Sequence, residues 1–283
     1  MNLENFKKNL KIERVLQLTA HPTYIVLGVL YFYGYQRPLY FYPLLMFFVY
    51  LFFFLFISFA NKISPYKEDL LTLTPFIIAG NIILNMEAYD IKSYILAGLI
   101  AVIARAFLKT QYGHIFNPGY FGVFAFSLLF PQHGFPSLGL WRSDLSLVLL
   151  IGILGHIVVY KAKRLHLIYG YMLGFSLFAI LTAIFCKTLG INHNGIIDMP
   201  ILFWPSTLIT TTSFIFIFHV ISDPKTSPTP PIYQFIFGAS IGLLDFILRF
   251  NKILPAESIA YMTVQMVFGF IYFKIPNLKN SKI

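Results

Sequence analysis

The polar side chains that could do chemistry gather in two proline-bearing segments of an otherwise apolar chain. The first contains His114, Asn117 and Pro118. Proline disfavours helix in the residue before it and lacks an N–H group, so a preceding helix is expected to end at Phe116 or Asn117. Pro118 suits the first turn of a new helix, with Asn117 as its cap. The segment predicts either a helix–turn–helix corner or a helix N-terminus that binds an anion.

The second segment runs from Ser222 to Pro231 and has four prolines in its last eight residues, which excludes a helix there. Its candidate ligand-contacting residues are Ser222, Asp223, Pro224, Lys225, Thr226 and Ser227. Serine and aspartate are ordinary turn residues, whereas hydroxyl groups beside a lysine also suit a phosphate or another polar ligand. The sequence leaves a stiff loop and a ligand-binding edge equally open.

Arg105 lies near the end of the apolar run 91–110, and Asp245 and Arg249 lie one helical turn apart in the ninth predicted span. Charged groups at membrane depth are costly and by default indicate a function such as an ion pathway. Asp245 and Arg249 are four residues apart, so on a helix they can neutralise each other on one face. Arg105 can instead extend to the membrane surface, as its nearness to Lys109 allows. These three residues form the candidate ion or charge pathway.

Histidines raise the alternative of haem, because a b-type haem takes axial histidine ligands from facing helices. His114, His156 and His219 are the candidates, and the last two fall in different apolar runs. Hydrogen bonding between helices is the favoured interpretation of such histidines. The single cysteine, Cys186, excludes a disulfide framework and a self-contained cysteine-ligated metal site. Cys186 is expected to pack as a small buried residue, and no metal site is predicted.

The composition predicts the class of protein. Of 283 residues, 58% are hydrophobic and 11% are charged, and the mean hydropathy is +0.73. A soluble domain has roughly 25% charged residues, because its surface must be hydrated. The 32 phenylalanines and 18 tyrosines suit lipid-facing surfaces and interfacial belts. The chain is therefore predicted to be an all-α polytopic integral membrane protein.

A membrane-crossing helix needs about 20 apolar residues, and ten apolar runs indicate about ten spans. They cover 22–35, 38–60, 69–87, 91–110, 117–132, 143–160, 166–186, 200–221, 231–248 and 256–273. The prediction is a single transmembrane domain over 22–273, between a cytoplasmic segment at 1–21 and a cytoplasmic tail at 274–283. An interruption near 133–143 separates halves of about 22–135 and 143–273. Each half has one polar X-Pro break, so two five-helix inverted repeats are expected.

Basic residues are unevenly distributed between the two sides of the predicted membrane domain. With the N-terminus inside, the cytoplasmic side has Lys7, Lys8, Lys11, Arg14, Lys62, Lys67, Lys109, Lys161, Lys163, Arg164, Lys225, Lys274, Lys279 and Lys282. The opposite side has only Arg37, Lys92, Arg142, Lys187, Arg249 and Lys252. The positive-inside rule explains this asymmetry, so the net charge of +10 predicts no nucleic-acid partner. Residues 1–20 lack the apolar core of a signal peptide. We expect a multi-pass protein of the inner (cytoplasmic) membrane with both termini cytoplasmic.

Two runs of residues resemble one family. The run Gly113 to Pro118, followed by an aromatic-rich span ending Leu-Phe-Pro131-Gln, is similar to a stretch in the flavin-bearing membrane subunits of the sodium-translocating NADH:quinone oxidoreductase and of the Rnf electron-transport complex. The run Ser222 to Pro228 resembles the Asp-Pro loop of the same family. The residues that follow resemble its glycine-rich penultimate helix: Tyr233, Phe237, Gly238, Ala239, Gly242, Asp245 and Arg249. The order and spacing agree over residues 70–275.

The resemblance implies a flavoprotein membrane subunit that binds FMN and riboflavin-type flavin and moves electrons coupled to Na⁺ or H⁺. The family attaches FMN to the threonine of a Ser-Gly-Ala-Thr run, whereas the corresponding stretch here, 134–143, has no threonine. The implied flavin, FMN or riboflavin, is therefore expected to be non-covalent. Its implied contacts are His114, Asn117, Pro118, Ser222, Asp223, Pro224, Lys225, Thr226 and Ser227, with Arg105 and Lys225 balancing charge. The nearest threonines, Thr210 to Thr212, are expected to hydrogen-bond between helices.

Three functions follow from these patterns. The first is electron transfer through a flavin, as one part of an oxidoreductase or translocase complex. The chain has no NADH-binding fold and no iron–sulfur cysteines, so other redox subunits or a flavin-bearing electron-transfer protein would be its partners, with membrane lipid around it. The second is transport of a small polar solute or a flavin on the same scaffold. The third is a structural or assembly role.

Overall fold

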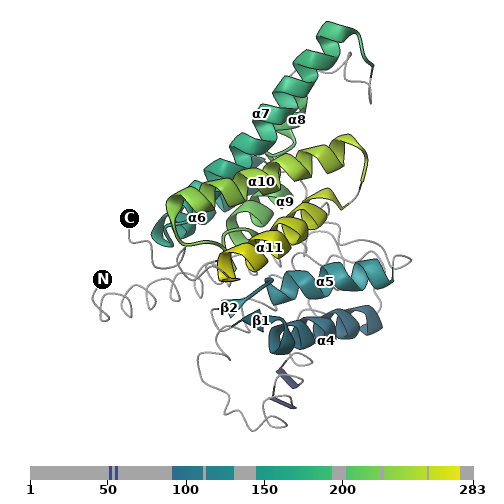
Figure 1. Ribbon diagram of the computed structural model, residues 1–283, viewed down its shortest axis with the longest axis vertical. Coiled ribbons are helices and arrows are strands. Elements are labelled where there is room, and N and C mark those ends of the chain that lie inside the picture. Colours follow the sequence, from purple (N-terminus) through teal and green to yellow (C-terminus); the bar gives the residue numbers. More distant parts are fainter. Residues whose placement is uncertain are drawn as a thin grey trace. The chain divides into compact units, whose positions relative to one another are not determined.

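A computed structural model describes residues 51–52, 55–56, 91–110, 113–130, 145–192, 202–223, 226–253 and 255–274 (Figure 1). This part of the chain is helical apart from two strands of two residues each, which confirms the prediction of a helical protein for these residues. The predicted spans 22–35 and 69–87 and most of 38–60 lie outside it, as do the predicted terminal segments apart from Lys274. The chain divides into two compact units, Met1–Leu140 and Trp141–Ile283.

The first unit contains a helix pair joined through a small hairpin. Helix α4 (Ile91–Phe107) is followed by strands β1 (Lys109–Thr110) and β2 (Gly113–His114), which pair antiparallel, and then by α5 (Pro118–Leu129). The two helices meet at small residues. A side chain on Gly122 would lie 2.5 Å from the carbonyl oxygen of Ala97 and 2.4 Å from Cβ of Ala101.

The end of α4 corrects one expectation. The helix was expected to continue to the residue before Pro118, but it ends at Phe107. Its last backbone bond runs from Leu108 N to Ala104 O, and Ile115 N then donates to Leu108 O across the hairpin. A β-branched residue, Thr110, and Gly113 favour helix less than the preceding apolar run, so the chain turns back before the proline.

The described part of the second unit contains four long helices. These are α6 (Leu145–Lys161), α7 (Leu165–Leu189), α10 (Pro231–Phe250) and α11 (Ala256–Lys274). They coincide within a few residues with the predicted runs 143–160, 166–186, 231–248 and 256–273. Gly190, with φ of 65°, ends α7 in the left-handed conformation that favours glycine.

Helices α7 and α10 point in the same direction and pack closely over their first halves, and they diverge beyond that contact (Figure 1). They meet at a glycine crossing formed by Gly170 and Gly174 of α7 and Gly238 and Gly242 of α10. A Cβ atom on Gly238 would lie 2.1 Å from Leu167 O, and one on Gly242 would lie 2.2 Å from Tyr171 O. The reciprocal glycines meet backbone oxygens of α10 at 2.2 and 2.4 Å. Each helix thus has two glycines four residues apart, the pattern that lets helices approach closely in membranes.

The segment predicted as one span at 200–221 is broken, so that prediction is wrong in its continuity. It forms α8 (Phe203–Ser206), a turn, α9 (Thr211–Ile215) and the π-helix η4 (Phe216–Val220). In the turn, the backbone N–H groups of Leu208 and Ile209 donate to the carbonyl oxygens three residues earlier, those of Pro205 and Ser206. Thr210 then caps the new helix, because its Oγ1 accepts from Ser213 N at 3.1 Å.

Two described helices, α7 and α10, are long and apolar enough to cross a membrane. Shorter apolar helices of 10–17 residues lie within 95–104, 120–129 and 148–161. In an apolar 18-residue stretch of each of these two helices, 44% is buried, so more than half of each stretch is not covered by the described protein. The outward residues of α7 are large and apolar: Leu173, Leu177, Phe178, Leu181, Ile184 and Phe185.

Candidate functional site

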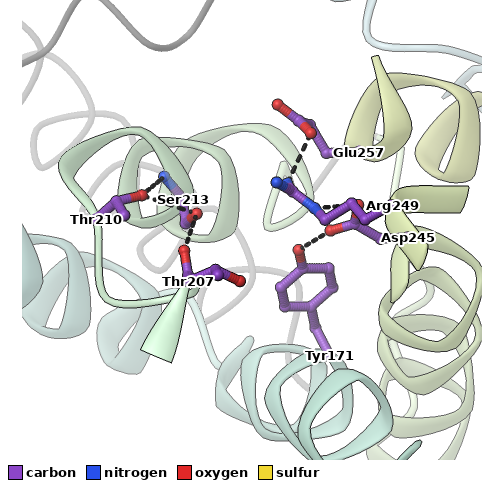
Figure 2. Close-up of polar contacts among 7 residues, drawn as sticks. All are labelled: Tyr171, Thr207, Thr210, Ser213, Asp245, Arg249 and Glu257. Carbon is purple, nitrogen blue, oxygen red and sulfur yellow. Dashed lines mark hydrogen bonds and ion pairs between the residues drawn. The ribbon is translucent and has the colours of Figure 1, made fainter. Parts of the chain in front are cut away.

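A buried charge network joins α7, α10 and α11 (Figure 2). Its members are Tyr171, Asp245, Arg249 and Glu257. Tyr171 Oη donates to Asp245 Oδ2 at 2.5 Å, and Arg249 Nε donates to Asp245 Oδ1 at 2.8 Å. Arg249 Nη2 donates to Glu257 Oε2 at 2.7 Å. Asp245 is fully buried, whereas 24% of the Arg249 side chain and 13% of the Glu257 side chain are exposed.

Helical spacing and a tight turn assemble this network. Asp245 and Arg249 are one turn apart on α10, and the expected ion pair between them is confirmed. The chain then reverses at Lys252, which has a φ of 59°. Glu257 follows in the first turn of α11, where a carboxylate is favoured by the helix dipole. Arg249 thereby bridges carboxylates from two helices.

The network lies where α10 ends and α11 begins, beside the first third of α7. Tyr171 is the seventh of the 25 residues of α7, Arg249 is the last but one residue of α10, and Glu257 is the second residue of α11. One turn beyond the glycine crossing, the rings of Phe175 and Phe246 meet edge to face with centroids 5.7 Å apart.

Aromatic rings cover the network on the side of the broken segment. Phe216 of η4 packs edge to face against Tyr171 at 5.8 Å and against Tyr261 at 6.1 Å. All three residues are buried. A π-helical turn is rare and often marks a functional site; here it is the turn that places Phe216 between the two tyrosines.

A second polar group lies in the broken segment (Figure 2). Thr210 Oγ1 donates to Ser213 Oγ at 2.9 Å, and Ser213 Oγ donates to Thr207 O at 3.3 Å. These contacts are local, so the bonds described for Thr210 do not link helices as expected. The side chains of Thr211 and Thr212 lie outside the described residues.

The Asp-Pro loop folds around its own backbone. Ser222 Oγ donates to Phe218 O at 2.5 Å, and Ser227 Oγ donates to Asp223 O at 2.8 Å. The backbone N–H groups of Thr226 and Ser227 donate to the same Asp223 carbonyl at 3.2 and 3.0 Å. Pro224 and Lys225 lie outside the described residues. The loop therefore brings Ser222, Asp223, Thr226 and Ser227 together as a hydrogen-bonded turn.

Neighbouring helices fix this turn through a group that we call the loop clamp: Arg164, Gln234 and Gln265. Gln265 Nε2 of α11 donates to Thr226 O at 2.5 Å, and Arg164 Nη1 donates to Pro228 O at 2.5 Å. The three clamp side chains are buried, with exposed fractions of 7% or less.

Gln234 ties the loop to a second connector. Its Nε2 donates to Thr229 O at 2.8 Å and to Lys163 O, in the turn between α6 and α7, at 3.1 Å. The two connectors therefore lie at the same end of the second unit.

The first proline-bearing segment forms the expected capped corner. Asn117 is the N-cap of α5, and its Oδ1 accepts from Tyr120 N at 3.2 Å. Phe121 N donates to Asn117 O at 2.9 Å, and Pro118 has no N–H group. Three of the first four residues of α5 thus have no free donor for an anion. The side chain of His114, in β2, lies outside the described residues.

The remaining candidates are scattered. Arg105 lies on α4 and His219 on η4, and neither side chain is among the described ones. His156 is exposed on α6. Cys186 is buried and free, as expected, beside Ala183. Within the described residues, no three histidine, cysteine, aspartate or glutamate side chains are placed to hold a metal ion.

The sequence interpretation missed Tyr171, Glu257 and the loop clamp. The paired glycines of α7, four residues apart like those of α10, were a usable signal for the helix contact that positions Tyr171. Glu257 was also visible as an acid soon after Arg249. The clamp gave no signal, because glutamines that donate to backbone carbonyls have no characteristic spacing.

No family model matches the chain, and a search of curated proteins finds no match either. The resemblance to a family therefore rests on the two sequence runs described above.

Proposed function

We propose that the chain is a multi-pass membrane protein of about ten helices, arranged as two five-helix inverted repeats in the inner membrane. The described helices support the membrane placement, because large apolar side chains lie on their outside and polar side chains lie inside. Large apolar side chains of α7 face outward, while Asp245, Gln234, Gln265 and Ser258 are buried. Soluble proteins seldom expose large contiguous apolar patches. Lipid is the solvent that suits such a surface.

We further propose that the protein moves charge across the membrane as part of a redox complex. The observation that carries this proposal is the fully buried Asp245, held between Tyr171 and Arg249. Ionisable groups buried in a membrane protein indicate by default a function such as an ion or proton pathway. The resemblance to the sodium-translocating and Rnf complexes supplies the redox part, with electrons passing through a non-covalent flavin.

The resemblance implies flavin contacts in each segment taken by itself: His114, Asn117 and Pro118 in the first and the Ser222–Ser227 loop in the second. The hydroxyl groups of Ser222 and Ser227 donate within the loop. The loop's proposed contribution therefore comes mainly from Lys225, which would balance the charge of a phosphate or a reduced flavin. Partner subunits would provide the electron donor and acceptor.

A visible absorption spectrum tests the redox proposal. The full chain is purified in mild detergent, and its spectrum is recorded before and after filtration under denaturing conditions. A yellow, reducible chromophore that stays with the folded protein and passes the filter after denaturation is the expected result. A colourless protein would exclude electron transfer through a resident flavin.

Transport of a small polar solute is the second candidate, and the broken segment favours it. Transporter sites typically lie at discontinuous helices, and residues 203–220 combine a broken helix, a π-helical turn and the Thr210–Ser213 hydroxyl pair. A colourless protein that carries a small polar solute into proteoliposomes would support this candidate over the first.

A further inference from the structure

The charge network and the loop clamp take side chains from the same helices at two levels. Helix α11 contributes Glu257 to the network and, eight residues later, Gln265 to the clamp, so about 12 Å of helix separates the two. Helix α10 likewise contributes Asp245 to the network and Gln234 to the clamp. Tyr261 lies between the two levels, four residues from each of the α11 members. An effect of one group on the other must pass through the residues of this interval.

Side-chain contacts cross the interval as a continuous series. Tyr171 donates to Asp245 of the network, and its ring packs on Phe216 with centroids 5.8 Å apart. Phe216 packs in turn on the ring of Tyr261 at 6.1 Å. Tyr261 Oη and Thr226 Oγ1 share a hydrogen bond of 3.3 Å. The series therefore leads from a buried carboxyl group to the Asp-Pro loop, and Phe216 is its middle member.

Phe216 is also joined to the loop through its own backbone. It begins the π-helical turn η4, in which Ile221 N donates to Phe216 O at 3.1 Å. Ser222 of the Asp-Pro loop follows directly, and its Oγ donates to Phe218 O. A shift of the loop therefore reaches Phe216 by two routes, through η4 and through Tyr261.

The π-helical turn offers a discrete change of arrangement. Its hydrogen bonds join residues five apart, one more than in an α-helix. If η4 changed to an α-helical turn, one side of it would rotate by about 100° relative to the other, and Phe216 would leave its place between the two tyrosines. Tyr171, Phe216 and Tyr261 are buried, and closely packed rings shift between distinct positions rather than gradually. Coupling between separated groups requires an element that can change in this way.

We propose that η4, with Phe216 as its positioning residue, couples the Asp-Pro loop to the charge network. This inference rests on the proposed function, because a redox-driven ion pathway needs the flavin site to act on the charged residues. In the π-helical arrangement, Phe216 holds the Tyr171 ring so that its hydroxyl group donates to Asp245. When the loop moves and η4 rearranges, Tyr171 loses this support and Asp245 loses a donor. Order in the loop and the Tyr171–Asp245 bond are therefore maintained together.

Hydrogen exchange tests the coupling on the full chain in mild detergent, by mass spectrometry of peptides that contain Thr226 and Ser227. The N–H groups of these residues donate to Asp223 O, so their exchange reports opening of the loop. Tyr171→Phe keeps the ring and removes the bond to the charge network. We expect it to speed exchange in the loop roughly 2- to 30-fold, although the substitution lies on another helix.

Tyr169→Phe is the matched control, because Tyr169 lies on the same helix with half of its surface exposed. This variant should exchange in the loop as the wild type does. A folded Tyr171→Phe protein whose loop exchanges no faster than that of the control would overturn the proposal.

Phe216→Leu tests the middle of the series. We expect it to speed exchange in the loop as well, and the protein with both Tyr171→Phe and Phe216→Leu should exchange no faster than Phe216→Leu alone, because both changes act through the same contact. Effects that multiply would show that the two residues act independently, against the proposal. If size exclusion shows that Phe216→Leu does not fold, the comparison of Tyr171→Phe with Tyr169→Phe decides by itself.

The exchange measurement needs no bound flavin. A colourless protein would remove the flavin from the proposed function and leave the exchange result as it stands, so the two failures are distinguishable.

Discussion

The charge network and the loop clamp are two buried polar groups in the same helical unit, and they are built differently. The charge network joins side chains to side chains, with ion pairs centred on Arg249. In the loop clamp, by contrast, side chains donate to the backbone carbonyls of Thr226, Pro228 and Thr229. The clamp satisfies carbonyls that a proline-rich loop cannot pair by itself.

This difference separates a structural role from a functional one. Buried carbonyl groups need donors, and two neutral amides and one arginine meet that need without changing protonation. Two carboxyl groups around one guanidinium are an expensive way to hold helices together, because hydrophobic residues often pack as stably. The network is therefore the better candidate for function, although the Asp-Pro loop has the more distinctive sequence.

Breaking the charge network should have the largest effect. Asp245→Leu removes the acceptor of both Tyr171 and Arg249 and leaves Arg249 paired with Glu257 alone. We expect a loss of about 3–5 kcal/mol in the free energy of unfolding, measured by denaturant titration in mild detergent. Asp245→Asn is the control and should lose less, because it keeps the volume and a hydrogen-bond acceptor. Equal losses would show that charge pairing is not the contribution of Asp245.

Disturbing the glycine crossing should weaken both the charge network and the loop clamp, because the crossing positions α10 against α7. Gly238→Ala places a methyl group 2.1 Å from Leu167 O, so the helices must separate. We expect a loss of about 1–3 kcal/mol by the same titration. Gly152→Ala is the matched control, since its nearest neighbour is the ring of Phe214, which can move. A Gly238 variant as stable as the Gly152 variant would contradict the close backbone packing.

Removing one donor of the loop clamp should have a moderate effect. Gln265→Met keeps the side-chain volume but leaves Thr226 O without this donor. The expected loss is about 1–2 kcal/mol, together with faster hydrogen exchange at Thr226 and Ser227. Thr263→Val, at an exposed position of the same helix, should have little effect. If both variants behave alike, the clamp does not hold the loop.

The smallest effect is expected within the Asp-Pro loop itself. Ser227→Ala removes one hydroxyl donor to Asp223 O, but the backbone N–H of Ser227 still donates there. We expect a loss below about 1 kcal/mol and an unchanged flavin content per protein. Loss of the chromophore in this variant would show that the hydroxyl contacts the flavin and that the loop is more than a clamped turn.

The sequence was most informative where one physical effect dominates. Long apolar runs predicted α6, α7, α10 and α11 within a few residues, because burial and helix length both follow from composition. Asn117 and Pro118 predicted the start of α5, since a cap and a first-turn proline act locally. The Asp245–Arg249 pair was also predictable, because helical spacing alone brings the two residues together.

Other features depended on contacts between distant parts of the chain. The hairpin after Phe107 replaced helix because pairing of Lys109–Thr110 with Gly113–His114 competed with helical continuation. The break at 207–210 lies between Pro205 and the hydroxyl-bearing residues Thr210 to Ser213. These local signals were outweighed by the apolar character of the run as a whole. Tyr171 joins Asp245 across 74 residues of sequence, a distance over which neither periodicity nor composition carries information.

Helices α7 and α10 point in the same direction, and this has a consequence for how the chain would cross a bilayer. If two neighbouring helices cross a membrane in the same direction, the chain between them must cross back to the side on which the first helix began. The stretch from Gly190 to Asp223 must make this crossing, since the loop clamp holds its far end beside the start of α7. Within the described part of that stretch, the helix is interrupted between Ser206 and Thr211. In the proposed membrane placement, the return path therefore contains a break between two helices, α8 and α9.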